Sequence, residues 1–394
     1  MRWASAVDTD NSLRAAVEHA AETVFLGLGR QEPDLAVVFV SSEHAAHFDA
    51  IPALLQREFE NVFVFGCSGG GVIGGGREIE DRPAFSLTGA VLPGVRLKGT
   101  HLDAAQVPPV YAEARAWEDA LRITPSQQPS FLMLADPFSF EPESFIKGMD
   151  RIYPLAAKIG GQASGARQVG GTALYLGNQV YHSGCITLAL TGNIEVDMLV
   201  SQGCRPIGDP LFVTAAHENL VRELDGRSPR DVLSELFERL PASDRDLFSQ
   251  ALHLGMAMRT DANEFTPGDF LIRGILGMDP QSGALWVSAN LPANSVVQFH
   301  LRDAAASAMD LERTLTTYKA SHLVQPDAGA LLFSCHGRGI GLYGQADHDC
   351  NAFRRLVADL PIGGVFCNGE IGPIQNATFL HGYASAFAVI QEKK

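Results

Sequence analysis

The feature that most constrains the fold of this sequence is a unit of buried strand, helix and second strand that occurs three times. Each first strand is a continuous apolar run of the kind buried on both faces of a sheet, and each second strand ends in glycine and small polar residues. The first strands are predicted at 35–40, 130–135 and 328–333, and the second strands lead into 66–76, 159–165 and 364–373. Such units have right-handed crossovers and parallel strands, so their polar ends are expected to converge on one edge of a sheet.

Sequence patterns typical of antiparallel strands lie between these units. Residues 84–90 with 95–101 are predicted to form one hairpin, and 172–176 with 180–182 another, across Gly177-Asn178. In the second half, an antiparallel sheet is predicted from strands at 253–258, 270–275, 284–288 and 296–301. The expected fold class is therefore α/β (mixed α+β), with mixed sheets and hairpins in two closely packed domains.

The expected domain organisation has three parts. Residues 12–28 place apolar side chains at helical spacing, so residues 1–30 are assigned to an N-terminal helix. A boundary near the glycine- and proline-containing segment 203–208 then separates a first domain, 31–205, from a second, 206–394.

Composition and charge exclude several classes of partner. The chain of 394 residues carries a formal net charge of −15 and has no cluster of Lys and Arg, so neither nucleic acid nor an anionic membrane surface is expected as a partner. Membrane insertion is not expected either, because Asn193, Glu195 and Asp197 interrupt the longest apolar segment, around 185–200. The start lacks the apolar core of a signal peptide, and six widely spaced cysteines contain no CxxC pair, which favours free thiols in a cytoplasmic protein.

The stretch GCSGGGVIGGG at 66–76 matches two catalytic patterns. One is a nucleophile elbow around Ser68, and the other is a dinucleotide-binding fingerprint that begins at Gly69. Both patterns need a helix directly afterwards, but each interior glycine would cost a helix about 1 kcal/mol relative to alanine. We therefore expect a loop that lets backbones approach closely, and no cofactor.

The cysteines and histidines raise two further possibilities, a cysteine nucleophile and a metal site. Cys67 or Cys367 could act as a nucleophile with His336 as base, because backbone N–H groups at strand ends can lower the pKa of a thiol. No third group orients the histidine, so this cysteine-dependent enzyme is kept as the alternative function. No metal is expected, since no zinc-finger spacing occurs among Cys335, His336, His348, Cys350, Cys367 and His381.

A polar rim at the converging strand ends is the candidate binding site. Its mixture of hydroxyls, charges and backbone N–H groups suits a small zwitterion, with Arg338 for a carboxylate and Glu370 or Asp136 for an amine. The candidate ligand-binding residues are Ser42, Cys67, Ser68, Asp136, Ser164, His336, Arg338, Asn368 and Glu370.

Four segments together resemble the FIST family, in the expected order and over nearly the whole chain. They are VFGCSGGGVIG at 64–74 with EIE at 78–80, VQFHLRD at 297–303, GRG at 337–339 with LYG at 342–344, and FCNGEIGPI at 366–374 with FLHGY at 379–383. Ala384 departs from the hydroxyl residue usual after the last segment. The resemblance implies a FIST N-terminal domain, a FIST C-terminal domain and a sensory, signal-transducing module that binds small ligands such as amino acids. It supplies no catalytic residues, and any output would pass to a separate downstream signalling protein.

Overall fold

The structure is a computed structural model that describes residues 1–259, 265–266 and 268–393. It divides into two compact units. The three-sheet unit contains Met1–Ser201 and the chain from Leu311 onward, and the barrel unit contains Gln202–Asp310. The chain thus leaves the three-sheet unit after Ser201 and returns to it at Leu311.

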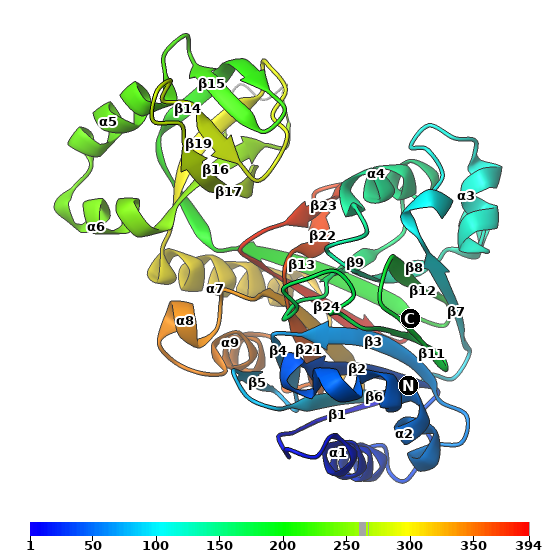
Figure 1. Ribbon diagram of the computed structural model, residues 1–394. Helices are drawn as coiled ribbons and strands as arrows, with labels where there is room; N and C mark the ends of the chain where they lie inside the picture. The colour runs from blue at the N-terminus through cyan, green and yellow to red at the C-terminus, as the bar shows by residue number, and fades with distance from the viewer. Residues whose placement is uncertain (260–264, 267, 394) are drawn as a thin grey trace. The chain divides into compact units, whose positions relative to one another are not determined.

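Each predicted strand–helix–strand unit forms the centre of its own six-stranded sheet (Figure 1). The parallel pairs are β2 (Leu35–Ser41) with β3 (Phe63–Gly69), β8 (Ser130–Ala135) with β9 (Lys158–Gln162), and β20 (Gly329–Cys335) with β21 (Ile362–Cys367). The connecting helices are α2 (Ile51–Glu58), α4 (Pro142–Ile152) and α9 (His348–Leu356). The mixed α/β class and the parallel pairs are confirmed. The units nevertheless lie in three sheets, because a hairpin on one side and separate antiparallel strands on the other flank each pair.

The hairpin that follows each unit in the chain belongs to the sheet of another unit. After β3, the hairpin of β4 (Gly71–Gly74) and β5 (Arg77–Glu80) pairs with β21, and after β21, the hairpin of β22 (Glu370–Ile374) and β23 (Ala377–His381) pairs with β9. After β9, the predicted hairpin of β10 (Leu174–Leu176) and β11 (Gln179–Tyr181) is confirmed and pairs with β3. The first sheet's unit thus adds a hairpin to the third sheet, the third to the second, and the second to the first. The glycine stretch 66–76 is the point where the chain passes from the first sheet to the third.

Antiparallel strands complete each sheet on the other side. They are β6 (Phe85–Val91) with β1 (Arg2–Asp8), β12 (Cys185–Gly192) with β7 (Val95–Leu102), and β24 (Ala384–Gln391) with β13 (Glu195–Gln202). The hairpin predicted from 84–90 and 95–101 is wrong, because β6 pairs with β1 and β2 whereas β7 pairs with β12. Residues 2–8 form a strand of the first sheet, and the N-terminal helix α1 (Leu13–Gly27) begins after its cap Ser12.

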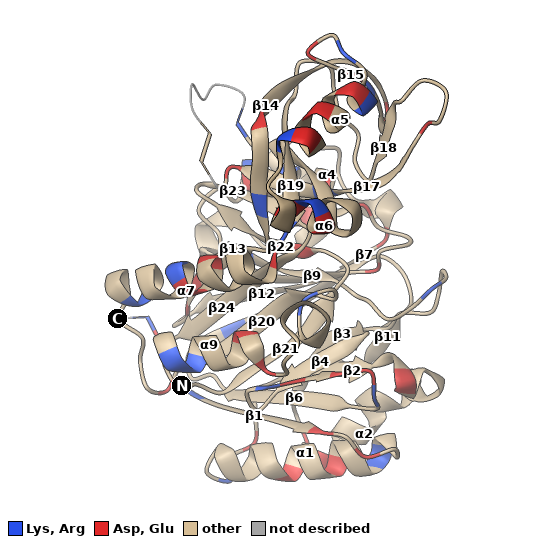
Figure 2. Ribbon diagram, turned by 90° about the vertical axis from the view of Figure 1, so that its left-hand side faces the viewer, with Lys and Arg blue, Asp and Glu red and all other residues tan. Residues whose placement is uncertain are grey.

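Apolar side chains bury both faces of all three sheets. Their inner faces share one central core, in which Phe39 of the first sheet meets Phe333 of the third edge to face. Their outer faces pack on helices: α1 and α2; α3 (Ala114–Leu121) and α4; α7 (Ala304–Ser321) and α9. This two-sided burial explains the continuous apolar runs of the strands. Figure 2 shows that charged residues lie mainly on helices and loops.

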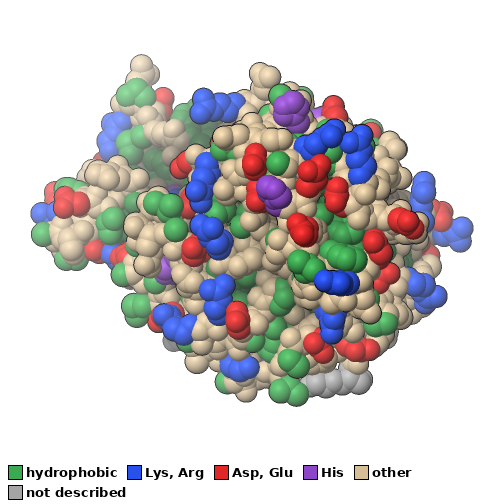
Figure 3. Space-filling model, turned by 90° about the horizontal axis from the view of Figure 1, so that it is seen from below, with side chains coloured by type: hydrophobic (Ala, Val, Ile, Leu, Met, Phe, Trp, Pro, Cys, Tyr) green, Lys and Arg blue, Asp and Glu red, His purple; other side chains and the backbone are tan. Residues whose placement is uncertain are grey.

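Short helical turns complete the three-sheet unit. They are η1 (Ser42–Ala50), η2 (Ala104–Gln106), η3 (Pro125–Gln127) and α8 (Ile340–Tyr343). None of the described helices is long and apolar enough to cross a membrane. Figure 3 shows acidic and basic side chains interspersed over the face seen from below.

The barrel unit is a closed six-stranded barrel with its own apolar core. Its strands, in order around the barrel, are β14 (Cys204–His217), β15 (Leu220–Leu224), β18 (Leu285–Val287), β17 (Phe270–Met278), β16 (Leu252–Ala257) and β19 (Val296–Arg302). Its helices are α5 (Pro229–Arg239) and α6 (Ala242–Ala251), and Ser228 caps α5 by accepting from Asp231 N. The antiparallel sheet predicted for the second half is confirmed in β16 to β19.

Candidate functional site

The three points where the chain changes sheets meet in one place. Each consists of a buried small residue, a polar residue and a glycine, and a Cβ added to Gly165 would lie 2.9 Å from both the Gly69 oxygen and the Gly70 nitrogen. A Cβ added to Gly161 would likewise lie 2.5 Å from Cys367 Sγ. We call this meeting point the crossing; it consists of Cys67-Ser68-Gly69, Ala163-Ser164-Gly165 and Cys367-Asn368-Gly369.

Ser164 connects all three parts of the crossing. Its Oγ accepts a hydrogen bond from Gly70 N (2.8 Å) and donates one to Phe366 O, and its N donates to Ser68 O (3.3 Å). Ser68 adds a bond in which its Oγ accepts from Ala173 N (3.0 Å). Both serines are buried, so their hydroxyls hold backbone groups that have no access to water.

Replacing Ser164 by alanine is therefore expected to destabilise the protein by about 1–3 kcal/mol, because it leaves the Gly70 N–H and the Phe366 carbonyl buried without their partner. Urea unfolding would measure the change. Ser144→Ala, at an exposed serine of α4, is the matched control. Equal stabilities of the two variants would contradict the linking role of Ser164.

A polar rim of accessible side chains surrounds the crossing. His336 and Asn368 are exposed, and Ser42 and Gln162 are half-buried. His336 N donates to Cys367 O (2.8 Å) and Asn368 N to Gln162 O (3.2 Å), which fixes the backbone of the rim. A Cβ at Gly70 would overlap the imidazole of His336, and a Cβ at Gly165 would lie 2.8 Å from that of Ser42. The glycines thus allow these side chains to approach the crossing.

Glu80, at the end of β5, is a carboxylate of this rim that the sequence reasoning did not select. Its Oε1 accepts from Ile340 N (2.9 Å), and its charge interacts with His336. Burial raises the pKa of this half-buried carboxyl. The only signal in the sequence was its place in the segment 78–80, next to the glycine stretch.

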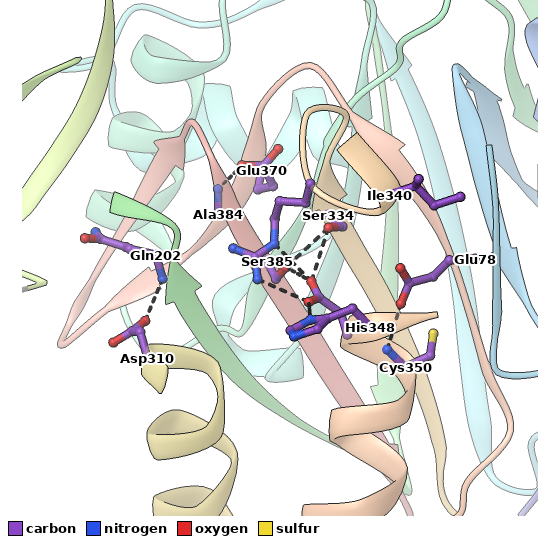
Figure 4. Close-up of polar contacts among 12 residues, drawn as sticks. Glu78, Gln202, Asp310, Ser334, Ile340, His348, Cys350, Glu370, Ala384 and Ser385 are labelled. Carbon is purple, nitrogen blue, oxygen red and sulfur yellow. Dashed lines mark hydrogen bonds and ion pairs between the residues drawn. The ribbon is translucent and has the colours of Figure 1, made fainter. Parts of the chain in front are cut away.

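Arg338 occupies a different environment from the one expected. It is buried, and its Nε and Nη2 donate to the two carboxylate oxygens of Asp349 (3.0 and 3.2 Å). Burial alone would raise the pKa of Asp349, but the Arg338 charge and several hydrogen bonds outweigh burial and hold it below its usual range. Figure 4 shows Ser334, Ser385 and His348 converging on the same carboxylate. The guanidinium is therefore committed to an internal ion pair and is not available for a ligand carboxylate.

Asp136 and Glu370 are also buried and committed to the protein. Asp136 accepts from the hydroxyls of Thr172 (2.7 Å) and Ser139 (2.6 Å), and Glu370 Oε2 accepts from Ala384 N (3.1 Å). The structure thus brings Ser42, Cys67, Ser68, Ser164, His336 and Asn368 together at the crossing and its rim. Asp136, Arg338 and Glu370 instead stabilise the surrounding loops and hairpins.

Glu78 is a second buried carboxyl beside Asp349. Its Oε1 accepts from Cys350 N (2.8 Å), as Figure 4 shows, yet burial and the Asp349 charge raise its pKa from 4.5 to about 8. Between these two values the folded protein keeps a proton that the unfolded chain releases. The contribution of Glu78 to stability therefore falls as the pH rises from about 5 to 8.

We expect the free energy of unfolding to decrease across this pH range, and Glu78→Gln to remove most of that decrease because an amide does not titrate. Urea unfolding at several pH values would measure both slopes. An unchanged slope in the variant would show that other groups cause the pH dependence.

The thiols at the crossing lack the properties of nucleophiles. Burial raises the pKa values of Cys67 and Cys367, whereas a nucleophilic thiol needs a lowered pKa and access. The described hydrogen bonds include none between His336 and either sulfur. The geometry therefore gives no support to the cysteine-dependent enzyme.

Iodoacetamide at pH 7.5 is expected to leave Cys67, Cys185, Cys350 and Cys367 unlabelled in the native protein, because all four are buried and burial raises their pKa values. The half-buried Cys204 and Cys335 are expected to react first. Peptide mass spectrometry would identify the labelled thiols, with the denatured protein as the control for six reactive cysteines. Fast labelling of Cys67 or Cys367 would restore the enzyme hypothesis.

The described side chains do not contain a group of three or more His, Cys, Asp or Glu that could hold a metal ion. Two of the histidines named from the sequence make other contacts: His348 pairs with Asp349, and His381 Nε2 contacts Gly372 O.

Family models match most of the chain. The FIST N domain model matches residues 34–227, and the FIST C domain model matches residues 230–373. The chain belongs to the FIST family. FIST domains are generally sensory domains that bind small ligands, so the resemblance stated from the sequence motifs is confirmed at this level.

The curated relatives of this FIST protein have not been characterised. One, from Mycobacterium tuberculosis strain ATCC 25618 / H37Rv, is 34% identical over 389 residues, 99% of each chain. Another, from Mycobacterium bovis strain ATCC BAA-935 / AF2122/97, is 35% identical over 390 residues, 99% of this chain and 98% of that one. A solved cyanuric acid hydrolase from A. caulinodans aligns over 100% of both chains with a TM-score of 0.38 and 9% identity, too weak a likeness to carry an argument.

Proposed function

We propose that this FIST protein is a cytoplasmic sensor that binds a small zwitterion, such as an amino acid, at the rim of the crossing. The observation that carries the proposal is the convergence of three sheet-changing segments, which brings accessible polar groups from distant parts of the chain over a rigid, hydrogen-bonded base. Such convergence of a few polar groups on a preformed base is typical of small-molecule sites.

A carboxylate and hydrogen-bond donors at the rim suit the two ends of a zwitterion. Glu80 supplies a carboxylate for the amine, and His336 and Asn368 supply side-chain donors for the carboxylate. Ser42 and Gln162 add neutral hydrogen-bonding groups. Occupation of the rim would stabilise the crossing, and in this proposal the change is passed to a downstream signalling protein.

A thermal-shift screen against amino acids and small carboxylates would identify the ligand, because a molecule that binds only the native state raises its stability by RT ln(1 + [L]/Kd). We expect Glu80→Gln and His336→Ala to weaken binding of that ligand at least tenfold. The melting temperature without ligand should change little, since the amide of Glu80→Gln would keep an oxygen for Ile340 N and His336 is exposed.

Glu22→Gln, at an exposed carboxylate of α1, is the matched control and should bind like the original protein. If both rim variants keep the full response to the ligand, the site lies elsewhere. If no compound in the screen raises the melting temperature, the ligand class is wrong.

A further inference from the structure

The three-sheet unit contains a cavity at the opposite ends of two of its strands. The crossing follows the carboxyl end of β9, whereas the cavity opens where β8 and β9 begin, with Ser130 and Ala157 in its lining. Its volume is about 620 Å³, which falls within the range of small-molecule sites. The crossing and the cavity are therefore separate places in the same unit.

Apolar groups make most of the cavity wall. Ile194 and Val196 are buried, and Leu155 at the same cavity is 99% exposed. The cavity therefore offers a ligand a mainly apolar wall, as small-molecule sites usually do.

The wall is held in place by a buried lysine. Lys158 Nζ donates to Tyr153 O (2.7 Å) and Ala156 O (3.1 Å), so it fixes the loop that carries Leu155. It also pairs with Asp150 (2.9 Å), and the Tyr153 hydroxyl donates to Ile123 O (2.8 Å). The cavity is thus preformed, which lowers the entropic cost of binding.

The charged group that a strand of the cavity wall carries is a carboxylate. Glu195 lines it at the start of β13, and the described hydrogen bonds and ion pairs include none for its carboxylate. Burial and the negative charges of Asp197 and Glu195 all raise the pKa of the Tyr318 hydroxyl. The carboxylate of Asp197 therefore lies near that of Glu195, and it accepts a hydrogen bond from the Tyr318 hydroxyl (2.8 Å). Lys393 is the only cation in the described lining, and it lies near the chain end rather than on a strand.

We propose that this cavity is a second ligand site, which takes an amine with an apolar body. The apolar body fills the space beside Ile194 and Ala157, and the ammonium group pairs with Glu195. This site differs from the rim of the crossing in position and in ligand class.

Isothermal titration with 4-phenylbutylamine and its acidic counterpart 4-phenylbutyrate tests the proposal. We expect saturable binding of the amine, and at least tenfold weaker binding of the acid. Ala157→Trp fills the cavity and should weaken the amine at least tenfold, whereas Ala116→Trp, at an exposed position of α3, should not.

Glu195→Gln keeps the fold because Glu195 is exposed, and it should reduce amine affinity about fivefold while leaving that of the acid unchanged. Glu80→Gln should bind the amine normally, which separates this site from the rim. Equal binding of amine and acid, or full amine binding by both Ala157→Trp and Glu195→Gln, would overturn the proposal.

Discussion

Replacing Arg338 by methionine is expected to destabilise the protein by about 3–5 kcal/mol, because it leaves the buried Asp349 carboxylate without its counter-charge. Asp349 also accepts from Ser385 and lies beside Glu78, so loss of the guanidinium exposes two neighbouring carboxyls to each other. Urea unfolding would measure the change. This expectation replaces the ligand-binding role that the sequence suggested for Arg338, since a binding residue could be removed without such a loss.

The matched control is Arg354→Met, at a half-exposed arginine of α9 that pairs with the exposed Asp359 (3.1 Å). Exposed pairs contribute about 0–1 kcal/mol, so this variant should remain close to the original protein. Combining Arg338→Met with Asp349→Asn should recover part of the stability, because it removes the uncompensated charge. A loss below about 1 kcal/mol in the single variant would contradict the structural role of the pair.

Gly66→Ala is expected to destabilise the protein by about 3 kcal/mol or more, since the added Cβ would overlap the carbonyl oxygen of Val38 on the neighbouring strand. A backbone carbonyl in a parallel pair cannot move aside as a side chain can. The other two pairs have the same close approach, at Gly160 against Met133 and Gly364 against Leu332. The same substitution at either position should therefore have a similar effect.

Gly341→Ala is the control, because a Cβ there would have nothing within 4 Å. Its free energy of unfolding should stay within about 0.5 kcal/mol of the original value. Unchanged stability of Gly66→Ala would mean that β2 and β3 do not approach as closely as described.

Local patterns were sufficient to predict the three strand–helix–strand units. Strands covered on both faces must be apolar throughout, and Leu35–Ser41 and Gly329–Cys335 show that pattern directly. The choice of pairing partner could not be predicted, because it depends on contacts between distant segments. Phe85–Val91 and Val95–Leu102 are adjacent in sequence and have hairpin spacing, yet they lie in different sheets.

The candidate site was predictable to a similar degree. The convergence of Ser68, Ser164 and Asn368 follows from the polar ends of the second strands, which the sequence displays. The commitment of Arg338 to Asp349 does not, since an arginine in a glycine-rich loop carries no local sign of a buried partner 11 residues away. Glu80 was overlooked because only the fold brings the end of β5 to Ile340.

The most direct test of the sensor is a crystal structure of the protein with the ligand that the thermal-shift screen identifies. We expect the ligand at the rim of the crossing, with its amine within hydrogen-bond distance of Glu80 and its carboxylate within reach of His336 and Asn368. A ligand bound elsewhere, with the rim unchanged, would contradict the central claim.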